Sequence, residues 1–331
     1  MPQDLLPDFS KLHVVVAGDI MLDIYRWGDV ERISPEAPVP VVSIRRSESR
    51  LGGAANVALN CRALGAKVTV ASVIGKDEEG AALLRLLEEH NIDAALVQQS
   101  ERRTTTSKTR ILSRNQQMIR LDAEMNEALD TQDEHAFIDA TLRYLQIQKP
   151  DVLIFEDYNK GVLKQNVIEK ITTHCRALNI LIAVDPKLHN FFAYRHADIF
   201  KPNLKEVREG LHIALPAINE ASMQQVHDLL QERLQHHITF VTLSEKGVYY
   251  NEGKNGKIVP SHLRNIADVS GAGDTVIAVA AMVYALTRDV ARMAEWSNIA
   301  GGLVCEEVGV VPVNKQKLLE EIARLQPQES S

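Results

Sequence analysis

The sequence predicts an α/β fold: a doubly wound, mostly parallel β-sheet with helices on both faces, plus a small additional β-sheet. Three observations lead to this fold class. Short runs of branched apolar residues recur along the chain, helical periodicity fills the intervals between them, and two stretches follow neither pattern. Buried strands that alternate with helices are typical of a parallel sheet covered on both faces. The 331 residues are 45% hydrophobic and 24% charged, a composition typical of globular proteins.

Six short apolar runs are predicted to be buried strands, because each is rich in Val, Ile or Phe and is followed by polar residues or Gly. In chain order they are 12–17, 68–74, 152–155, 180–184, 199–200 and 238–243. Five of them are followed by the polar residues Asp19, Asp157, Asp185, Asn203 and Ser244. The carboxyl ends of parallel strands share one edge, where ligands bind, so these residues predict one functional site.

Helical patterns lie between the strands, at 54–64, 78–90, 133–148, 165–178, 222–234 and 273–286. The apolar run 275–286 is shorter than the roughly 20 residues that cross a bilayer, so we expect a buried helix. The stretches 29–49 and 104–122 predict exposed antiparallel strands that form a lid or a dimer surface, with ordinary long loops as the alternative. One domain is expected at 11–325 with these strands inserted, followed by a disordered tail at 326–331.

Charge and cysteine content narrow the possible partners and the compartment. A net charge of −7 is opposite to what a surface for binding nucleic-acid phosphates requires. The N-terminus has neither the basic nor the apolar segment of a signal peptide, and no membrane span is expected. Cys61, Cys175 and Cys305 lie far apart, which fits a reducing cytoplasm and argues against a disulfide framework or a thiolate zinc site.

The segment Asp268–Asp274 contains Gly271, Ala272 and Gly273 directly before a helical pattern. Glycines at a helix start let backbone N–H groups approach an anion, and the helix dipole favours negative charge there. A carboxylate at the same place repels a phosphate unless it serves as a base. The alternative is that Asp274 is an ordinary first-turn residue and the glycines allow close packing.

A second glycine motif, Gly52, Gly53 and Asn56, also opens a helical pattern. Paired glycines let a ligand reach the backbone, and an Asn side chain can both donate to and accept from a sugar hydroxyl. The alternative is a glycine turn with an exposed Asn. The sequence contains no GxxxxGK[ST] and no GxGxxG after the first strand, which argues against P-loop kinases and nicotinamide-dependent dehydrogenases.

Four motifs in order resemble the PfkB (ribokinase-like) carbohydrate kinases over about residues 12–315: 52–56, 203–206, 242–247 and 268–274. The resemblance implies a ribokinase-like doubly wound fold with a β-lid, and phosphoryl transfer from ATP to a sugar. One departure concerns the late motif, where Val269 and Ser270 replace the two threonines that are common in the family. Any side-chain role of the first threonine is therefore in doubt.

The segments 32–42, 112–122 and 157–161 resemble one branch of that family, the D-glycero-β-D-manno-heptose 7-phosphate kinases of ADP-heptose synthesis for lipopolysaccharide core. This implies phosphorylation of the anomeric C1 hydroxyl to give the 1,7-bisphosphate. Because the chain ends soon after the kinase core, we expect a stand-alone kinase without the adenylyltransferase that is often fused to it. The alternatives are a kinase for another sugar phosphate, of the fructose or tagatose type, and a non-catalytic sugar-binding sensor.

The resemblance also implies roles for individual residues. Asp274 would be the catalytic base, beside an anion hole formed by the backbone from Gly271 to Asp274. Asn203 and Glu206, with Leu204 and Lys205 between them, would order Mg²⁺ through water, although Asn203 and Glu206 also form a helix-capping pattern. ATP would lie along Ser244, Glu245 and Gly247, with adenine near Asn298, Gly301 and Gly302.

The sugar site would use Asp19 and, less strongly, Asp23, together with Gly52, Gly53, Asn56 and Asp185. The alternative is that either aspartate caps the segment that follows it. The 7-phosphate needs cations, since phosphate favours arginine forks and lysine ammonium groups. The candidates are Arg32, Lys108, Arg110, Arg120, Lys160 and Lys187. The implied partners are a sugar phosphate, ATP, Mg²⁺, a second copy of the chain bound through the lid strands, and K⁺ as an open possibility.

Overall fold

The structure, a computed structural model, describes residues 7–114, 116–262 and 266–325. Their core is a nine-stranded sheet with the order β13-β12-β11-β10-β9-β8-β1-β4-β5, antiparallel only at β11–β12 and β12–β13. Its strands are β1 (His13–Gly18), β4 (Lys67–Gly75), β5 (Asp93–Ser100), β8 (Val152–Glu156), β9 (Leu181–Asp185), β10 (Ile199–Phe200), β11 (Ile238–Thr242), β12 (Val248–Asn251) and β13 (Lys257–Val259). The tail predicted at 326–331 lies outside the described residues.

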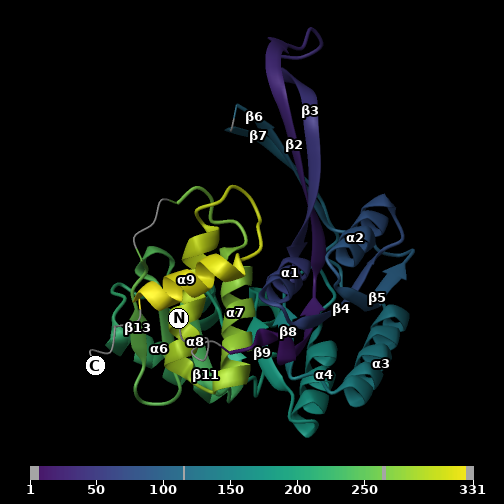
Figure 1. The fold of residues 1–331 in the computed structure, drawn as a ribbon. Coiled ribbons are helices and arrows are strands. Elements are labelled where there is room, and N and C mark those ends of the chain that lie inside the picture. The colour runs from purple at the N-terminus through teal and green to yellow at the C-terminus, as the bar shows by residue number, and fades with distance from the viewer. Residues whose placement is uncertain (1–6, 115, 263–265, 326–331) are drawn as a thin grey trace.

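Helices cover both faces of this sheet (Figure 1), because alternate residues of a strand point to opposite faces. In β1, Val14 and Val16 pack with one group of helices and Val15 packs with the other. The first group is α1 (Ala54–Leu64), α2 (Glu78–Glu89), α7 (Ala272–Thr287), α8 (Val290–Val304) and α9 (Lys315–Leu325). The second group is α3 (Thr131–Gln148), α4 (Gln165–Ala177), α5 (Leu204–Leu211) and α6 (Glu220–Leu234). The predicted fold class is confirmed.

The six predicted strands and six predicted helices are all present, with ends displaced by at most two residues. The apolar run 275–286 lies in α7, whose residues from Asp274 to Tyr284 are buried, as predicted. β5 was not identified, because this edge strand is only partly buried and carries a mixed polar and apolar sequence. None of the helices in the described ranges combines the length and apolarity that a membrane crossing requires.

A four-stranded sheet, which we call the projecting sheet, extends from the body (Figure 1) in the order β3-β2-β6-β7. Its strands are β2 (Ile20–Ile33), β3 (Pro40–Gly53), β6 (Ser107–Ser113) and β7 (Gln116–Ala123). The two hairpins are antiparallel as predicted, but β2 and β6 pair in parallel, because both strands leave the large sheet in the same direction. β2 also starts earlier than expected, so Asp23 lies on this sheet.

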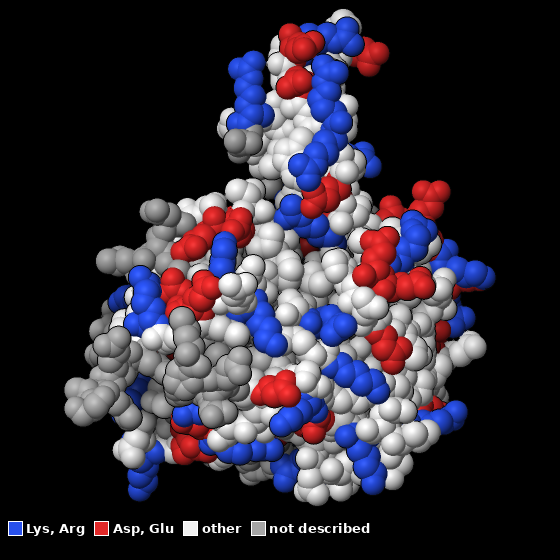
Figure 2. Space-filling view, viewed as in Figure 1, with Lys and Arg blue, Asp and Glu red and all other residues white. Residues whose placement is uncertain are grey.

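Burial changes along the projecting sheet. Residues 20–23 of β2 and 51–53 of β3 are buried in the body, whereas residues 31–33 and 43–47 are exposed. On the face seen in Figure 2, Lys and Arg side chains follow the projecting part, and both signs of charge are mixed over the body. The buried base of this sheet therefore lies close to the strand ends, and its tip extends away from them.

Candidate active site

Several strands of the large sheet end at one edge, and the side chains at their ends meet there. β8 and β9 are in register, so that Glu156 lies opposite Asp185. The N-terminus of α7 reaches the same edge, because a Cβ on Gly273 would lie 3.9 Å from both the Asp185 carboxylate and the Lys201 ammonium group. The fold thus brings strand-end carboxylates to the glycine motif that precedes Asp274.

Asp274 lies in the first turn of α7 and is 4% exposed. Nδ2 of Asn56 donates to its Oδ2 at 2.7 Å, and the hydroxyl of Tyr158 donates to its Oδ1 at 2.7 Å. Burial raises the pKa of Asp274 to about 6, against the effect of these two hydrogen bonds, and the charge of Asp185 adds to the rise. A carboxylate with a fixed orientation and a pKa near neutrality is suited to take a proton from a hydroxyl group.

Asn56 was expected at a sugar hydroxyl, but the structure directs its amide to Asp274. Asn60, one turn later in α1, donates its Nδ2 to Oδ1 of Asn56 at 3.3 Å and so fixes the orientation of that amide. Oδ1 of Asn60 accepts hydrogen bonds from Oγ1 of Thr275 at 3.0 Å and from N–H of Val313 at 2.9 Å. Because both ends of the Asn56 amide have protein partners, we assign it to positioning Asp274.

Tyr158 was not among the predicted site residues, although the motif at 157–161 contains it. Its hydroxyl contacts Asp274, and Nζ of Lys187 lies 5.1 Å from the centre of its ring. Burial raises the pKa of Tyr158 well above its usual value, and the charge of Asp274 adds to this rise. Tyr158 therefore stays protonated and serves as a hydrogen-bond donor to the carboxylate.

Asp19 was the preferred sugar ligand, but its carboxylate is directed into the loop after β8. It accepts backbone hydrogen bonds from Tyr158 at 2.8 Å, Lys160 at 3.0 Å and Val162 at 3.2 Å. Burial raises the pKa of Asp19 despite these bonds. Asp19 fixes the loop that presents Tyr158 to Asp274, and the sugar-binding roles of Asp19 and Asp23 stay predictions.

A buried ionic cluster lies beside Asp274. Nζ of Lys201 lies 2.7 Å from Oδ2 of Asp185, and these side chains are 2% and 7% exposed. Nζ of Lys187 lies 2.7 Å from Oε1 of Glu206. Both oxygens of the fully buried Glu156 lack a hydrogen-bond partner, and burial, together with the charge of Asp185, raises the pKa of Glu156 well above its usual value. Neither Lys201 nor Glu156 was singled out from the sequence.

The residues predicted to order magnesium lie beside this ionic cluster. Asn203 and Glu206 form a capping box at the start of α5, in which Oδ1 of Asn203 accepts from N–H of Glu206 at 2.9 Å and Oε2 of Glu206 accepts from N–H of Asn203 at 2.8 Å. In the described residues no group of three or more His, Cys, Asp or Glu could hold a metal ion. The Glu206 carboxylate and the Asn203 amide oxygen therefore fit an Mg²⁺ ion only through its water ligands, with the substrate phosphates as its direct ligands. Between Asn203 and Glu206, Leu204 is half-buried and Lys205 pairs with Glu209.

The N-terminus of α7 has the geometry of an anion site. Gly271 adopts φ 78° and no side chain caps the helix. The N–H of Ala272 donates to the carbonyl of Val269 at 3.3 Å, so this group is already engaged. For the anion hole predicted from the sequence we therefore keep only the N–H groups of Gly273 and Asp274. A Cβ on Gly273 would lie 3.9 Å from both the Asp185 carboxylate and the Lys201 ammonium group.

Asp23 lies at the base of the projecting sheet and is 3% exposed. Its carboxylate forms an ion pair with Arg110 of β6. A Cβ on Gly52 would collide with this carboxylate, so Gly52 makes room for Asp23 rather than for a ligand. Gly53 has φ 57°, and a Cβ there would meet the carbonyl of Asp19 at 2.5 Å.

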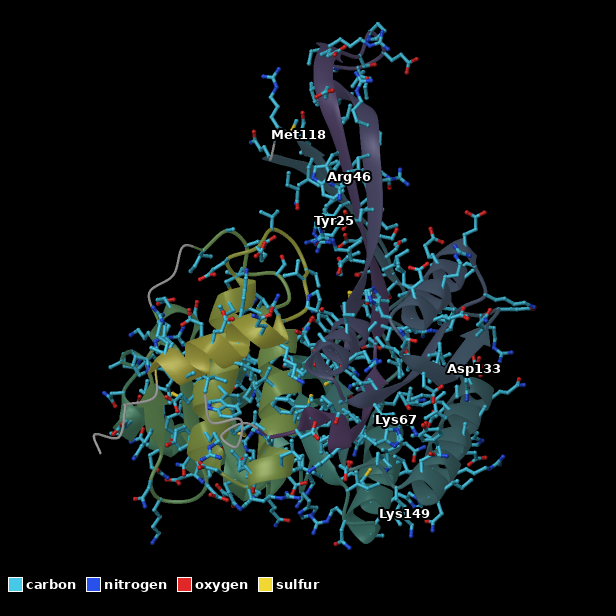
Figure 3. The ribbon with its side chains drawn as sticks, in the orientation of Figure 1. Tyr25, Arg46, Lys67, Met118, Asp133 and Lys149 are labelled. Atoms are coloured by element: carbon cyan, nitrogen blue, oxygen red, sulfur yellow. The ribbon has the colours of Figure 1, made fainter. Side chains whose placement is uncertain are left out.

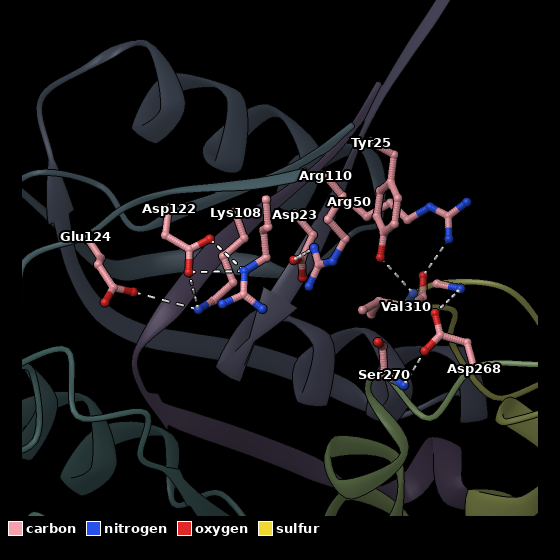
Figure 4. Close-up of polar contacts among 12 residues, drawn as sticks. Asp23, Tyr25, Arg50, Lys108, Arg110, Asp122, Glu124, Asp268, Ser270 and Val310 are labelled. Carbon is pink, nitrogen blue, oxygen red and sulfur yellow. Dashed lines mark hydrogen bonds and ion pairs between the residues drawn. The ribbon is translucent and has the colours of Figure 1, made fainter. Parts of the chain in front are cut away.

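The candidate cations for a distal phosphate separate into three groups. Lys108, which lies on β6 with Arg110 (Figure 4), is 3.7 Å from Glu124, and Lys160 lies 2.7 Å from the same carboxylate. Arg120 is exposed on β7 and bonds to Asp122, and Arg32 is exposed near the tip of the projecting sheet. Lys187 belongs to the ionic cluster. Of the predicted cations we therefore retain Lys108, Arg110 and Lys160 as candidates for binding the distal phosphate.

The predicted nucleotide residues lie after β11 and on α8. Ser244 and Glu245 are exposed in a short turn that closes at Gly247, which has φ 90°. Nδ2 of Asn298 donates to the carbonyl of Pro260 at 2.9 Å, which links α8 to the segment after β13. Gly301 is buried, and a Cβ there would lie 2.7 Å from Val276, so close packing of α7 on α8 requires it. Gly302 is partly exposed beside it.

Comparison with known proteins gives one family match and several similar sequences and solved structures. The model of the pfkB family of carbohydrate kinases matches residues 11–317. A "Bifunctional protein HldE" from Trichlorobacter lovleyi is 39% identical over 325 residues, which is 98% of this chain and 65% of that relative. The chain spans about 65% of the length of the curated relatives it matches.

Solved structures share the fold at low sequence identity. Phosphofructokinase-2 from Escherichia coli in complex with potassium superposes with a TM-score of 0.77 at 17% identity, over 95% of this chain and 99% of that chain. Arabidopsis thaliana ribokinase complexed with ribose and ATP gives a TM-score of 0.70 at 16% identity, over 93% and 99%.

Proposed function

The chain belongs to the pfkB family of carbohydrate kinases, and we propose that it transfers the γ-phosphoryl group of ATP to the C1 hydroxyl of D-glycero-β-D-manno-heptose 7-phosphate. The observation that carries this proposal is the buried Asp274, held by Asn56 and Tyr158 at the N-terminus of α7 and facing a buried lysine. The products are the 1,7-bisphosphate and ADP. The reducing cytoplasm suits both ATP chemistry and three free thiols.

The reaction follows from the placement of charge. Asp274 takes the proton of the C1 hydroxyl, the oxygen attacks the γ-phosphorus in line, and the bond to the β–γ bridging oxygen breaks. The N–H groups of Gly273 and Asp274, with the ammonium groups of Lys201 and Lys187, stabilise the negative charge that the phosphoryl group carries. Glu206 and Asn203 would hold waters of a magnesium ion on the ATP phosphates, and that ion would supply further neutralisation of the phosphate charge.

The choice of heptose 7-phosphate rests on two further observations. The segments 32–42, 112–122 and 157–161 resemble the heptose 7-phosphate kinases, and the HldE relatives match nearly the entire chain. Lys108, Arg110 and Lys160 supply cations near Asp23, as a sugar with a distal phosphate requires. A kinase for another sugar phosphate is the second candidate, because the pocket selects the sugar and the fold does not.

A coupled ADP-release assay with Mg-ATP and a panel of sugars tests this proposal. The panel contains heptose 7-phosphate, unphosphorylated heptose, fructose 6-phosphate, fructose 1-phosphate and ribose, each with K⁺ and with Na⁺ in its place. We expect turnover with heptose 7-phosphate to exceed that with every other sugar. Preference for another sugar would overturn the substrate assignment, and the absence of turnover with all sugars would favour a sugar-binding sensor.

The pH dependence of turnover reports on Asp274. Its pKa of about 6 predicts that kcat falls about tenfold per unit below that pH, because the protonated acid accepts no proton. Tyr158→Phe removes a hydrogen bond to the ionised form, so the pKa of Asp274 rises and the acid limb moves to higher pH. The measurement is kcat against pH for both proteins, and an unmoved acid limb in the variant would argue against this pairing.

We place a homodimer contact on the projecting sheet. Its outer strands β3 and β7 are unpaired edges in the described structure, and Ile44, Ile119 and Leu121 are 44% to 51% exposed on them. Exposed apolar strand edges favour pairing with a second copy. Light scattering should give twice the chain mass of 36.9 kDa. Ile119→Glu should give the monomer mass, and Ile147→Glu, on the distant helix α3, should leave the dimer intact. A monomeric wild type would contradict this contact.

A further inference from the structure

A loop at residues 305–311, which we call the bridging loop, lies between the projecting sheet and the site. Nη1 of Arg50 on β3 donates to the carbonyls of Val308 at 3.2 Å and Val310 at 3.0 Å. The N–H of Val310 donates to the hydroxyl of Tyr25 on β2 at 3.2 Å. The Arg50 guanidinium lies 4.8 Å from the centre of the Tyr25 ring. Two strands of the projecting sheet thus hold one side of the bridging loop (Figure 4).

The other side of the bridging loop is bound to the glycine turn, which we define as residues 268–271. Oδ2 of Asp268 accepts from N–H of Gly309 at 2.9 Å, and Oδ1 accepts from N–H of Ser270 at 2.9 Å. A Cβ on Gly271 would lie 3.4 Å from Val310. Since Gly271 is the N-cap of α7, this turn sets where the helix begins and where the N–H groups of its first turn point.

Gly309 lies at the centre of this arrangement. It adopts φ 76°, and a Cβ there would lie 2.9 Å from Nη1 of Arg50 and 3.0 Å from the Tyr25 hydroxyl. The positive φ favours glycine, and a side chain at this position would also displace the Arg50 guanidinium and the Tyr25 hydroxyl, the groups that bond to the loop. The close approach therefore requires glycine, and the contact extends without a break from β2 and β3 through the bridging loop to the glycine turn.

We propose that Arg50 and Tyr25 are positioning residues for phosphoryl transfer: acting through the bridging loop, they hold the glycine turn in the shape that directs the N–H groups of Gly273 and Asp274 at the transferred phosphoryl group. This inference rests on the proposed roles of those two N–H groups. Its consequence is that transfer is fast only while the base of the projecting sheet lies on the bridging loop.

The chain offers a matched control for Arg50. Arg46 lies on the same face of β3, four residues toward the tip, and also bonds to Glu48. Its guanidinium lies 4.6 Å from the centre of the Trp27 ring, as that of Arg50 lies over Tyr25. Arg46 is farther out than Tyr25 (Figure 3) and its bonding partner is Glu48 rather than the bridging loop. Arg46→Ala removes the same group from the same surface without touching the loop.

Hydrogen exchange of the protein without substrates tests the physical link, and steady-state kinetics tests its effect. In Arg50→Ala we expect faster amide exchange in both 305–311 and 266–271. We expect kcat to fall about 10- to 100-fold through misplacement of the anion hole, with KM for both substrates within about twofold. Tyr25→Phe, which removes one oxygen and keeps the ring, should change both readouts in the same direction, and Arg46→Ala should change neither.

The inference is overturned if exchange in 266–271 is unchanged in both variants, if KM rises while kcat is unchanged, or if Arg46→Ala has the effect of Arg50→Ala. The exchange measurement needs no sugar. A protein that phosphorylates none of the sugars would therefore refute the proposed function, while the exchange result would still decide whether the projecting sheet positions the glycine turn.

Discussion

Replacing Asp274 with Asn is expected to lower kcat by about 10²- to 10⁴-fold, the range that a positioned general base supplies. The amide cannot take the proton of the C1 hydroxyl. It also has one acceptor oxygen where the carboxylate has two, while Asn56 and Tyr158 each donate a hydrogen bond. Affinities for ADP and for the sugar phosphate should change little, because the ion pairs at Asp23 and Lys187 remain.

Calorimetry and steady-state kinetics of Asp274→Asn separate these two effects. Glu320→Gln on the exposed face of α9 makes the same chemical change far from the site and should leave kcat unaltered. The unfolding midpoint of both variants confirms that the fold is retained. A kcat for Asp274→Asn within tenfold of the wild type would contradict the role of Asp274 as the base.

Replacing Lys201 with Met is expected to destabilise the protein by about 3–5 kcal/mol, the range observed when one partner of a buried ion pair is removed. Asp185 then loses the ammonium group at 2.7 Å and remains beside Glu156 with a side chain that is only 7% exposed. The methionine side chain fills a similar volume, so a cavity contributes little to the loss. The free energy of unfolding in urea measures the effect.

Lys205→Met is the matched control, four residues later in the chain. Its side chain is 80% exposed and lies 3.8 Å from Glu209. A surface pair of this kind contributes about 0–1 kcal/mol, so the control should change stability by less than about 1 kcal/mol. Equal effects of the two variants would show that the Asp185–Lys201 pair is not the buried ionic contact that the structure gives.

The elements of the large sheet were predictable because their signal is local. Val14, Val15 and Val16 are branched and apolar, and Gly18 follows them. Such a strand can be recognised from its own residues, whatever packs against it. Asp93–Ser100 carries no such signal, since an edge strand has one neighbour and keeps part of its surface in water. The parallel pairing of β2 with β6 joins segments more than 80 residues apart and depends on the path of the whole chain.

The side-chain contacts at the site could not be predicted, because the partners lie far away in sequence. Asn56 and Asp274 are 218 residues apart, and Asp19 lies 139 residues from Tyr158. Sequence position identified Asp19, Asn56 and Gly52 as polar or small residues near a ligand edge. It could not indicate that Asn56, Asp19 and Gly52 contact other parts of the protein at the site. It also gave no sign that Lys201 is buried.

The position of the new phosphate tests the central claim most directly. We would incubate the protein with Mg-ATP and D-glycero-β-D-manno-heptose 7-phosphate and record phosphorus–proton NMR spectra of the product. The account predicts a second phosphate coupled to the anomeric proton, in the β configuration, with the 7-phosphate retained. A phosphate on any other carbon, or ADP release with only inorganic phosphate formed, would contradict it.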